Sequence, residues 1–213
     1  MARITVLAGT NGAGKSSIAG AMLRHRGAEY YNPDEATRRI LAANPGMDEA
    51  NANSLAWQEG VRQLETAIAT PQDYAFETTL GGRTITASLL KAAKSGIPIH
   101  LWYAGLDSPE RHLARIQARV AKGGHDIPKD KVRERYTTSR ANLIQLMPYL
   151  SALRVFDNSE EADPTTAKPP TPRLVLAVDG DQVTHPRDAQ AMSATPEWAK
   201  PIVALAISRV TAL

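Results

Sequence analysis

Several features are missing from this 213-residue sequence, and each absence excludes a class of protein. There is no cysteine, so disulfides, thiolate metal sites and cysteine nucleophiles are excluded, which suits a reducing compartment. No apolar run approaches the roughly 18 residues that a membrane span needs. The short apolar run at residues 3–7 leads straight into a glycine-rich loop and is too brief for a signal peptide. We therefore expect a cytoplasmic globular protein without membrane contact.

A strong charge of either sign is also missing, because the formal net charge is only +3. The distribution is uneven, since eight lysines and arginines stand against four acids between Glu110 and Arg135. The rest of the chain is close to neutral. A basic excess over the whole chain, which is typical of many nucleic-acid-binding proteins, is absent. We therefore do not expect a nucleic-acid partner.

Short β-rich runs alternate with longer helical stretches over the first 160 residues. We predict strands at 3–8, 29–31, 74–76, 97–104 and 153–157, and helices at 14–24, 48–70, 84–94, 128–147 and from 108 to the glycine pair at 123–124. This alternation is typical of βαβ units with a parallel sheet. Residues 161–213 are expected to form a Pro-rich connector, an edge strand at 174–178 and a C-terminal helix at 198–209, interrupted near Pro201 and packed on the core.

A complete phosphate-binding motif follows the first predicted strand and opens the first predicted helix. It runs Gly9-Thr10-Asn11-Gly12-Ala13-Gly14-Lys15-Ser16, and Ser17 comes next. Backbone N–H groups of such a loop surround phosphates, and the helix N-terminus adds its positive end. We expect Lys15 to reach the β- and γ-phosphates and the Ser16 hydroxyl to bind Mg²⁺. The fold class is therefore α/β, a P-loop NTPase with three layers around a parallel sheet.

The loop alone does not distinguish kinases, GTPases and mechanical ATPases. The sequence has no Asn-Lys-x-Asp guanine motif and no Leu-Ser-Gly-Gly-Gln signature, which leaves a small-molecule phosphotransferase. We expect a core of residues 1–160 with a helical lid at residues 108–147. A Gly-Gly-His connector joins two basic helices there, the first with Arg111, Arg115 and Arg119 and the second with Arg133 and Arg135. Such a pair of helices suits a lid that closes over phosphates. The alternative is a solvated charged face. His125 in the connector either acts in the site or stabilises the loop.

Two acidic residues lie at the predicted carboxyl edge of the sheet. Asp34 follows the second strand and is either a catalytic base or a helix cap after Asn32-Pro33. Glu77 ends the third strand and could assist Mg²⁺ binding, hold an acceptor hydroxyl, or pair with a lid arginine. Thr78, Thr79 and Arg83 share its loop and are candidate acceptor-binding residues. The aromatic residues Trp57, Trp102, Tyr103 and Trp198 are expected to pack in or beside the core.

Together these motifs resemble the zeta-toxin family, and within it the small zeta-like P-loop kinases often labelled predicted ABC-type ATPases. The matching segments follow in order over residues 3–160: 8–17 (AGTNGAGKSS), 31–34 (YNPD), 76–80 (FETTL), 105–110 (GLDSPE), 119–128 (RVAKGGHDIP), 135–136 with 142–143, and 156–159 (FDNS). The resemblance implies transfer of the ATP γ-phosphate to a small molecule. In the studied toxins the acceptor is the 3′-hydroxyl of the amino-sugar of UDP-N-acetylglucosamine.

The resemblance also implies roles for individual residues. Asp34 matches the catalytic base and Glu77 the acid that contacts the acceptor. Arg119 and one of Arg133 and Arg135 match the arginines that clamp the phosphates, and Asn158 falls where related kinases hold adenine. The loop from Glu77 to Arg83 departs from the family, in which an arginine follows the acid more closely. An antitoxin, if this chain has one, is a separate polypeptide.

Two other functions remain open at this stage. A polynucleotide 5′-kinase would also place a basic lid beside a P-loop, and would bind oligonucleotides with strong salt dependence. A non-catalytic nucleotide-dependent switch would act by docking to a partner. The leading expectation is an ATP- and Mg²⁺-dependent kinase acting on a nucleotide-sugar-like small molecule.

Overall fold

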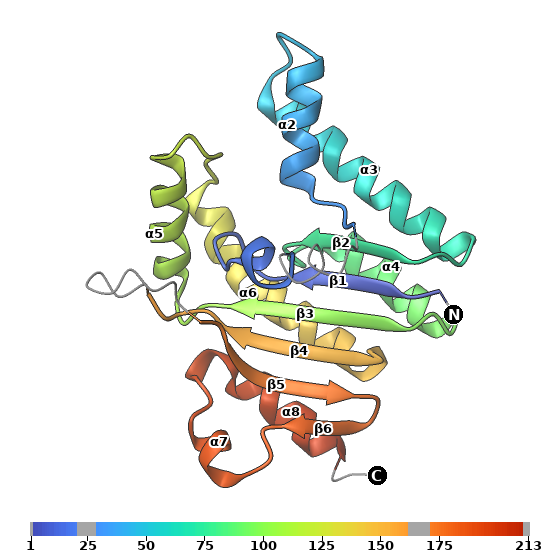
Figure 1. Cartoon of the computed structure of the whole chain (residues 1–213), viewed down its shortest axis with the longest axis vertical. Helices are drawn as coiled ribbons and strands as arrows, with labels where there is room; N and C mark the ends of the chain where they lie inside the picture. The colour runs from blue at the N-terminus through green and yellow to red at the C-terminus, as the bar shows by residue number, and fades with distance from the viewer. Residues whose placement is uncertain (1, 21–28, 162–170, 211–213) are drawn as a thin grey trace.

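Six strands form one mixed sheet in the computed structural model, which describes residues 2–20, 29–161 and 171–210. Their order is β2 (Tyr74–Thr78), β1 (Ile4–Ala8), β3 (Ile99–Gly105), β4 (Ala152–Asp157), β5 (Arg173–Asp179) and β6 (Gln182–His185). The first four are parallel, and β5 and β6 are antiparallel to their neighbours. Figure 1 shows the carboxyl ends of the parallel strands at one edge. The segments after β1 and β2 therefore meet there.

The described helices lie mainly on one face of the sheet, beyond its carboxyl edge and past β2. They are α2 (Pro33–Ala43), α3 (Glu49–Ala69), α4 (Arg83–Lys94), α5 (Pro109–Val120), α6 (Lys129–Leu146), α7 (Ala189–Ser193) and α8 (Lys200–Val210), with short turns η1 (Ser16–Gly20), η2 (Met147–Tyr149) and η3 (Glu197–Ala199). In Figure 1, α4, α6 and α8 lie behind the sheet, α5 stands beyond its carboxyl edge, and α2 and α3 project past β2. None of the described helices is both long and apolar enough to cross a bilayer.

The main core forms where one face of the sheet meets α4, α6 and α8, and it reaches α3 through Leu64. On β3, Ile99, Leu101 and Tyr103 are buried on this face, while the alternate residues His100 and Trp102 are half-buried. The core continues through residues of α6 and α8. The segment after 171 thus adds two strands and a helix to the same sheet and core.

A second, smaller hydrophobic cluster joins α5 to the start of α6. It consists of Leu113, Ile116, Ile127 and Val132, with Val120 packed against it. The C-terminal half of α6 instead contributes Leu143 and Leu146 to the main core. The lid expected over residues 108–147 therefore shares its last part with the core, and its separate part ends within α6.

Helix starts follow local signals, with the same arrangement in α2 and α5. Asn32 and Ser108 are the N-caps, and a proline occupies the first helical turn of each helix. Pro201 likewise lies in the first turn of α8. The helix expected at 198–209 is divided just before this residue, because Glu197–Ala199 form the separate turn η3 and α8 begins at Lys200.

Other expectations need correction. The sheet is parallel only over β1–β4. The strand expected at 29–31 is a single bridge between Tyr31 and Phe76. The strand expected at the edge, β5, is paired on both sides because β6 follows it through a tight turn. The helix expected at 14–24 begins as the π-helical turn η1, and its continuation from residue 21 lies outside the described residues.

Candidate active site

The phosphate-binding loop connects β1 to η1 and is packed against β3. Gly9, Gly12 and Gly14 have φ angles of +139°, +81° and +86°, a region that favours glycine. A Cβ on Gly9 would lie 2.1 Å from the carbonyl oxygen of Ala104, a backbone atom of β3. Lys15 is buried at the end of this loop. The motif therefore has the strand–loop–helix placement that phosphate binding requires.

Side chains from three distant segments hold the loop in place. The Asn158 amide donates to the Ala13 carbonyl at 2.9 Å. Arg135 of α6 donates from Nη1 to Asn11 Oδ1 at 2.9 Å, and its own carbonyl accepts from the Thr10 hydroxyl at 3.3 Å. Asn158, expected near adenine, is thus buried against the loop, and it does not line the cleft described below.

His112 on α5 supplies the third support, and the sequence reasoning missed it. Its Nδ1 lies 2.7 Å from the Asn11 carbonyl oxygen, so the neutral ring donates there. Its side chain is 1% exposed. The pKa of His112 is lowered from 6.5 to about 4, mainly by burial and to a smaller extent by Lys15 and Arg115, while the hydrogen bond to Asn11 acts in the opposite direction. His112 is therefore neutral at physiological pH.

Glu77, at the end of β2, contacts the last residues of the loop. Its Oε2 accepts from the Ser16 hydroxyl at 2.7 Å and from the Asn32 amide at 3.3 Å, and its Oε1 lies 3.5 Å from Lys15 Nζ. The expected alternative of a lid-arginine partner is wrong, since the cation beside Glu77 is Lys15.

The Ser16–Glu77 pair offers a hydroxyl and a carboxylate, which are hard oxygen donors of the kind Mg²⁺ prefers. No group of three or more histidine or acidic side chains in the described part of the chain could hold a metal.

Asp34 lies in the first turn of α2 but does not cap it. The cap is Asn32, whose Oδ1 accepts from the backbone N–H groups of Asp34 and Glu35 at 2.9 and 3.2 Å. The Asp34 carboxylate is left exposed, and its Oδ2 lies 3.7 Å from Arg119 Nη1. The carboxylate is therefore available for chemistry.

These groups line one cleft of about 730 Å³, within the usual range for small-molecule sites. Its walls are the P-loop, the start of α2, one face of α3, the end of β2, and lid residues that include Arg115, Arg119 and Arg135. Arg83 and Arg133 are not among the lining residues. Arg133 instead lies with Nη2 3.6 Å from Glu110 Oε1. Of the two arginines expected on α6, Arg135 faces the cleft.

The loop after β2 is ordered by its own threonines and by α6. The Thr78 and Thr79 hydroxyls accept from the backbone N–H groups of Leu80 and Gly81 at 3.0 and 3.4 Å. Ser139 donates to the Thr79 carbonyl at 2.6 Å. Both threonines line the cleft, on a loop whose shape is already set.

Trp57 on α3 corrects an expectation about aromatic packing. Tyr103 and Trp198 are buried as expected, but Trp57 is 49% exposed and lines the cleft. Asn53, Gly60 and Val61 line the cleft from the same helix face. The α3 side of the cleft thus carries a half-exposed aromatic ring. An exposed tryptophan in a polar helix is a weak sequence signal, because only the fold shows which face it occupies.

Arg119 ends α5 beside the connector of the lid. Its Nη2 donates to the His125 carbonyl at 2.7 Å, and the His125 ring pairs with Glu49 of α3. With the Arg119–Asp34 contact, two interactions connect the lid to the α2–α3 hairpin.

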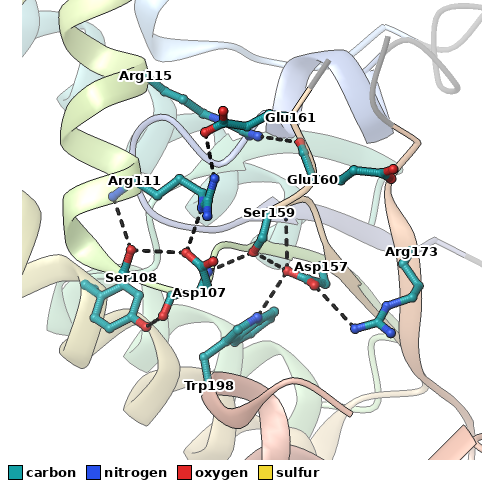
Figure 2. A network of polar contacts seen from close by, with 11 residues as sticks. Asp107, Ser108, Arg111, Arg115, Asp157, Ser159, Glu160, Glu161, Arg173 and Trp198 are labelled. Carbon is teal, nitrogen blue, oxygen red and sulfur yellow. Dashed lines mark hydrogen bonds and ion pairs between the residues drawn. The ribbon is translucent and has the colours of Figure 1, made fainter. Parts of the chain in front are cut away.

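A polar network anchors the other end of α5 to the segment after β4 (Figure 2). Arg111 bonds Asp107 at 2.8 Å and Glu161 at 2.7 Å, and Arg115 bonds the Glu160 carbonyl at 3.0 Å. Asp157 in turn accepts from the Trp198 indole at 3.2 Å. The start of α5 is therefore tied to the sheet, while its end reaches over the cleft.

Comparison with known proteins identifies relatives and structural neighbours. The AAA_33 family model, described as an AAA domain, matches residues 4–143. An uncharacterized protein of Haemophilus influenzae is 32% identical over 128 residues, covering 60% of this chain and 88% of the relative.

Solved structures with the same fold include the AvrRxo1-ORF1:-ORF2 complex with ATP, at TM-score 0.69 and 18% identity over 93% of this chain; this chain spans 64% of the matched one. The PezAT toxin–antitoxin system of Streptococcus pneumoniae matches at TM-score 0.51 and 13% identity, covering 74% of this chain and 67% of that one. A putative kinase from Chloroflexus aurantiacus matches at TM-score 0.50 and 15% identity, covering 65% and 79%.

The structural likenesses concern the fold, which is that of P-loop kinases. The family match covers well over half of the chain and includes β1, the P-loop, Glu77 and the lid. The chain therefore belongs to the AAA_33 family of AAA domains, with a kinase-like P-loop fold.

Proposed function

We propose that this protein is an ATP- and Mg²⁺-dependent kinase that phosphorylates a hydroxyl group of a small molecule. The observation that carries the proposal is that Lys15, the Ser16–Glu77 pair and the Asp34 carboxylate line one cleft. A P-loop kinase needs these three elements: phosphate contacts, a cation site and a base near the acceptor. The ATP-bound AvrRxo1 neighbour supports the choice of nucleotide.

In the proposed reaction, the acceptor hydroxyl gives its proton to the Asp34 carboxylate while its oxygen bonds to the γ-phosphorus of ATP. The bond from that phosphorus to the bridging oxygen breaks, and ADP leaves. Lys15, Arg119 and Arg135 neutralise the charge of the transferred group. Mg²⁺, when bound, neutralises the β- and γ-phosphates, and Ser16 and Glu77 are the residues that would hold it.

The acceptor proposed first is a nucleotide sugar, with the 3′-hydroxyl of UDP-N-acetylglucosamine as the leading candidate. The exposed Trp57 ring supports an acceptor with a sugar or base ring, because such rings stack on aromatic side chains. Thr78 and Thr79 lie on the same side as Glu77 and offer polar contacts.

The partner proposed is a separate antitoxin protein. AvrRxo1-ORF1:-ORF2 and PezAT are both two-protein systems. The cationic side chains Arg115, Arg119, Lys131 and Arg135 line the cleft and would attract an acidic segment.

The test is transfer of label from γ-labelled ATP to nucleotide sugars, nucleosides, dinucleotides and oligonucleotides, with Asp34→Asn beside wild type. Removing the base is expected to reduce turnover by about 10²–10⁴-fold while ATP binding persists. Glu35→Gln is the matched control, because it removes the neighbouring first-turn carboxylate, which does not line the cleft.

Three outcomes would contradict the proposal in different ways. Loss of ATP binding together with turnover in Asp34→Asn would make Asp34 structural. Label found only as free phosphate would favour an ATP-dependent switch. Transfer to oligonucleotide ends alone would identify a polynucleotide kinase.

A further inference from the structure

Asn32 connects the two acidic residues of the candidate active site through a single side chain. Its Oδ1 accepts from the backbone N–H groups of Asp34 and Glu35, and its Nδ2 donates to Glu77 Oε2 at 3.3 Å. The side chain is 5% exposed, and Glu77 is also buried. Hydrogen bonds in such a poorly solvated place are stronger and are costly to break.

The chemistry of the partners determines how this amide is oriented. Two backbone N–H groups require an acceptor on one side, and a carboxylate requires a donor on the other. Asparagine supplies both within one short side chain. Aspartate would keep the acceptor but face Glu77 with a second negative charge, and serine would cap the helix but is too short to reach Glu77.

Main-chain pairing brings the two residues into register. The Tyr31 N–H donates to the Ala75 carbonyl at 2.8 Å, and the Glu77 N–H donates to the Tyr31 carbonyl at 2.8 Å. Asn32 therefore starts beside the end of β2, at the point where the chain leaves the sheet edge and Pro33 begins α2. The side-chain contact completes a connection that the backbone has already prepared.

We propose that Asn32 is a positioning residue for phosphoryl transfer, which extends the function proposed above and rests on it. It holds the Glu77 carboxylate against Ser16 and Lys15, and it holds the first turn of α2, which carries Asp34. The base and the cation-binding groups thereby keep a constant separation. Misplacement of reacting groups by about 1 Å costs on the order of 100-fold in rate.

The test compares Asn32→Ser with wild type in two assays. Serine is a good N-cap, so the thermal midpoint should stay close to that of wild type. Loss of the Glu77 contact should lower kcat by about 10- to 100-fold with little change in KM for the acceptor. In titrations of ATP binding, the Mg²⁺ concentration needed for half-maximal affinity should rise. Asn32→Asp places an added negative charge beside Glu77, so it should lower kcat further and raise the required Mg²⁺ concentration further.

Asp48→Ala is the matched control for loss of a helix cap alone. Asp48 caps α3 by accepting from the Asn51 N–H at 2.8 Å, and it does not line the cleft. This variant should lower the thermal midpoint without changing the Mg²⁺ dependence of ATP binding. An equal fall in kcat in Asp48→Ala would reduce the Asn32 effect to general destabilisation and overturn the proposal.

Combining Asn32→Ser with Glu77→Gln shows whether Asn32 acts through Glu77, because coupled residues have non-additive effects. Additive effects on Mg²⁺-dependent ATP binding, or an Asn32→Ser variant with wild-type kcat and Mg²⁺ dependence, would overturn the positioning role. The binding assay separates this failure from failure of the proposed function. A wild-type chain that binds ATP with Mg²⁺ but phosphorylates no acceptor refutes the kinase. A higher Mg²⁺ concentration for half-maximal ATP affinity in Asn32→Ser would still show that Asn32 positions Glu77.

Discussion

The main core and the small cluster beneath the lid show how differently two parts of one chain are held. The main core joins the sheet to α3, α4, α6 and α8 and contains more than twenty buried apolar residues, whereas the lid cluster contains four. Regions with few buried apolar contacts open at lower free-energy cost than the core. The cleft proposed to bind ATP is thus bounded on one side by the part of the molecule with the smaller apolar cluster.

Polar contacts also differ between the two ends of the lid. The start of α5 is held by the Arg111 and Arg115 network. The end of α5 contacts α2 through the Arg119–Asp34 pair, and the connector that follows contacts α3 through the His125–Glu49 pair. Opening at the Arg119 end would break exposed ion pairs, which contribute little to stability. The sheet-proximal end of α5 is therefore held by more polar contacts than the end that carries Arg119.

Matched truncations in the two clusters give the largest expected effect. Leu101→Ala removes a fully buried core side chain and should lower the free energy of unfolding by about 2–5 kcal/mol. Ile116→Ala, in the lid cluster, should mainly speed amide hydrogen exchange within α5 and leave the urea midpoint near that of wild type. Equal shifts of the urea midpoint would mean that lid and core unfold as one unit.

Acidic pH should weaken the contact between lid and P-loop, with the next largest effect. The pKa of His112 is lowered from 6.5 to about 4, so the unfolded chain binds a proton between these values and the folded chain does not. Stability should therefore be full above pH 6.5 and fall as the pH drops towards 4, by about 3 kcal/mol in total.

The control for this prediction is His112→Asn, which keeps a donor for the Asn11 carbonyl without titrating in this range. Subtracting its pH profile from that of wild type, measured by urea unfolding, removes the contribution of the carboxylates. Parallel profiles would show that the imidazole is not the group that loses stability.

Two glycines provide the smallest and most closely matched comparison. Gly96 after α4 and Gly123 after α5 have φ angles of +81° and +83°, and a Cβ added at either residue would meet no atom within 4 Å. Alanine at either position should cost about 1–2 kcal/mol of backbone strain. We expect Gly96→Ala to lower the urea midpoint and Gly123→Ala to speed amide hydrogen exchange in the lid. The reverse pattern would contradict the division into core and lid.

Local signals in the sequence predicted much of this arrangement. The P-loop motif, the β-rich run at 97–104 and the helical run that starts at 108 are patterns of neighbouring residues, so the P-loop, β3 and α5 were placed close to where they lie. His112 was missed because its partner, Asn11, is 101 residues away, and nothing near His112 marks it as a loop contact. The exposure of Trp57 and the separation of Arg133 from Arg135 likewise depend on which helix face meets the cleft, which only tertiary packing decides.

The pairing of Tyr31 with β2 has a consequence for the protein in concentrated solution. Unpaired edge strands can recruit strands of other molecules and start aggregation. At the β2 edge, the Ala75 carbonyl and the Glu77 N–H are both occupied by Tyr31. A foreign strand would have to displace this segment, and with it the beginning of α2. The segment at Tyr31, which leads into α2 and the candidate active site, thus also protects this edge of the sheet from self-association.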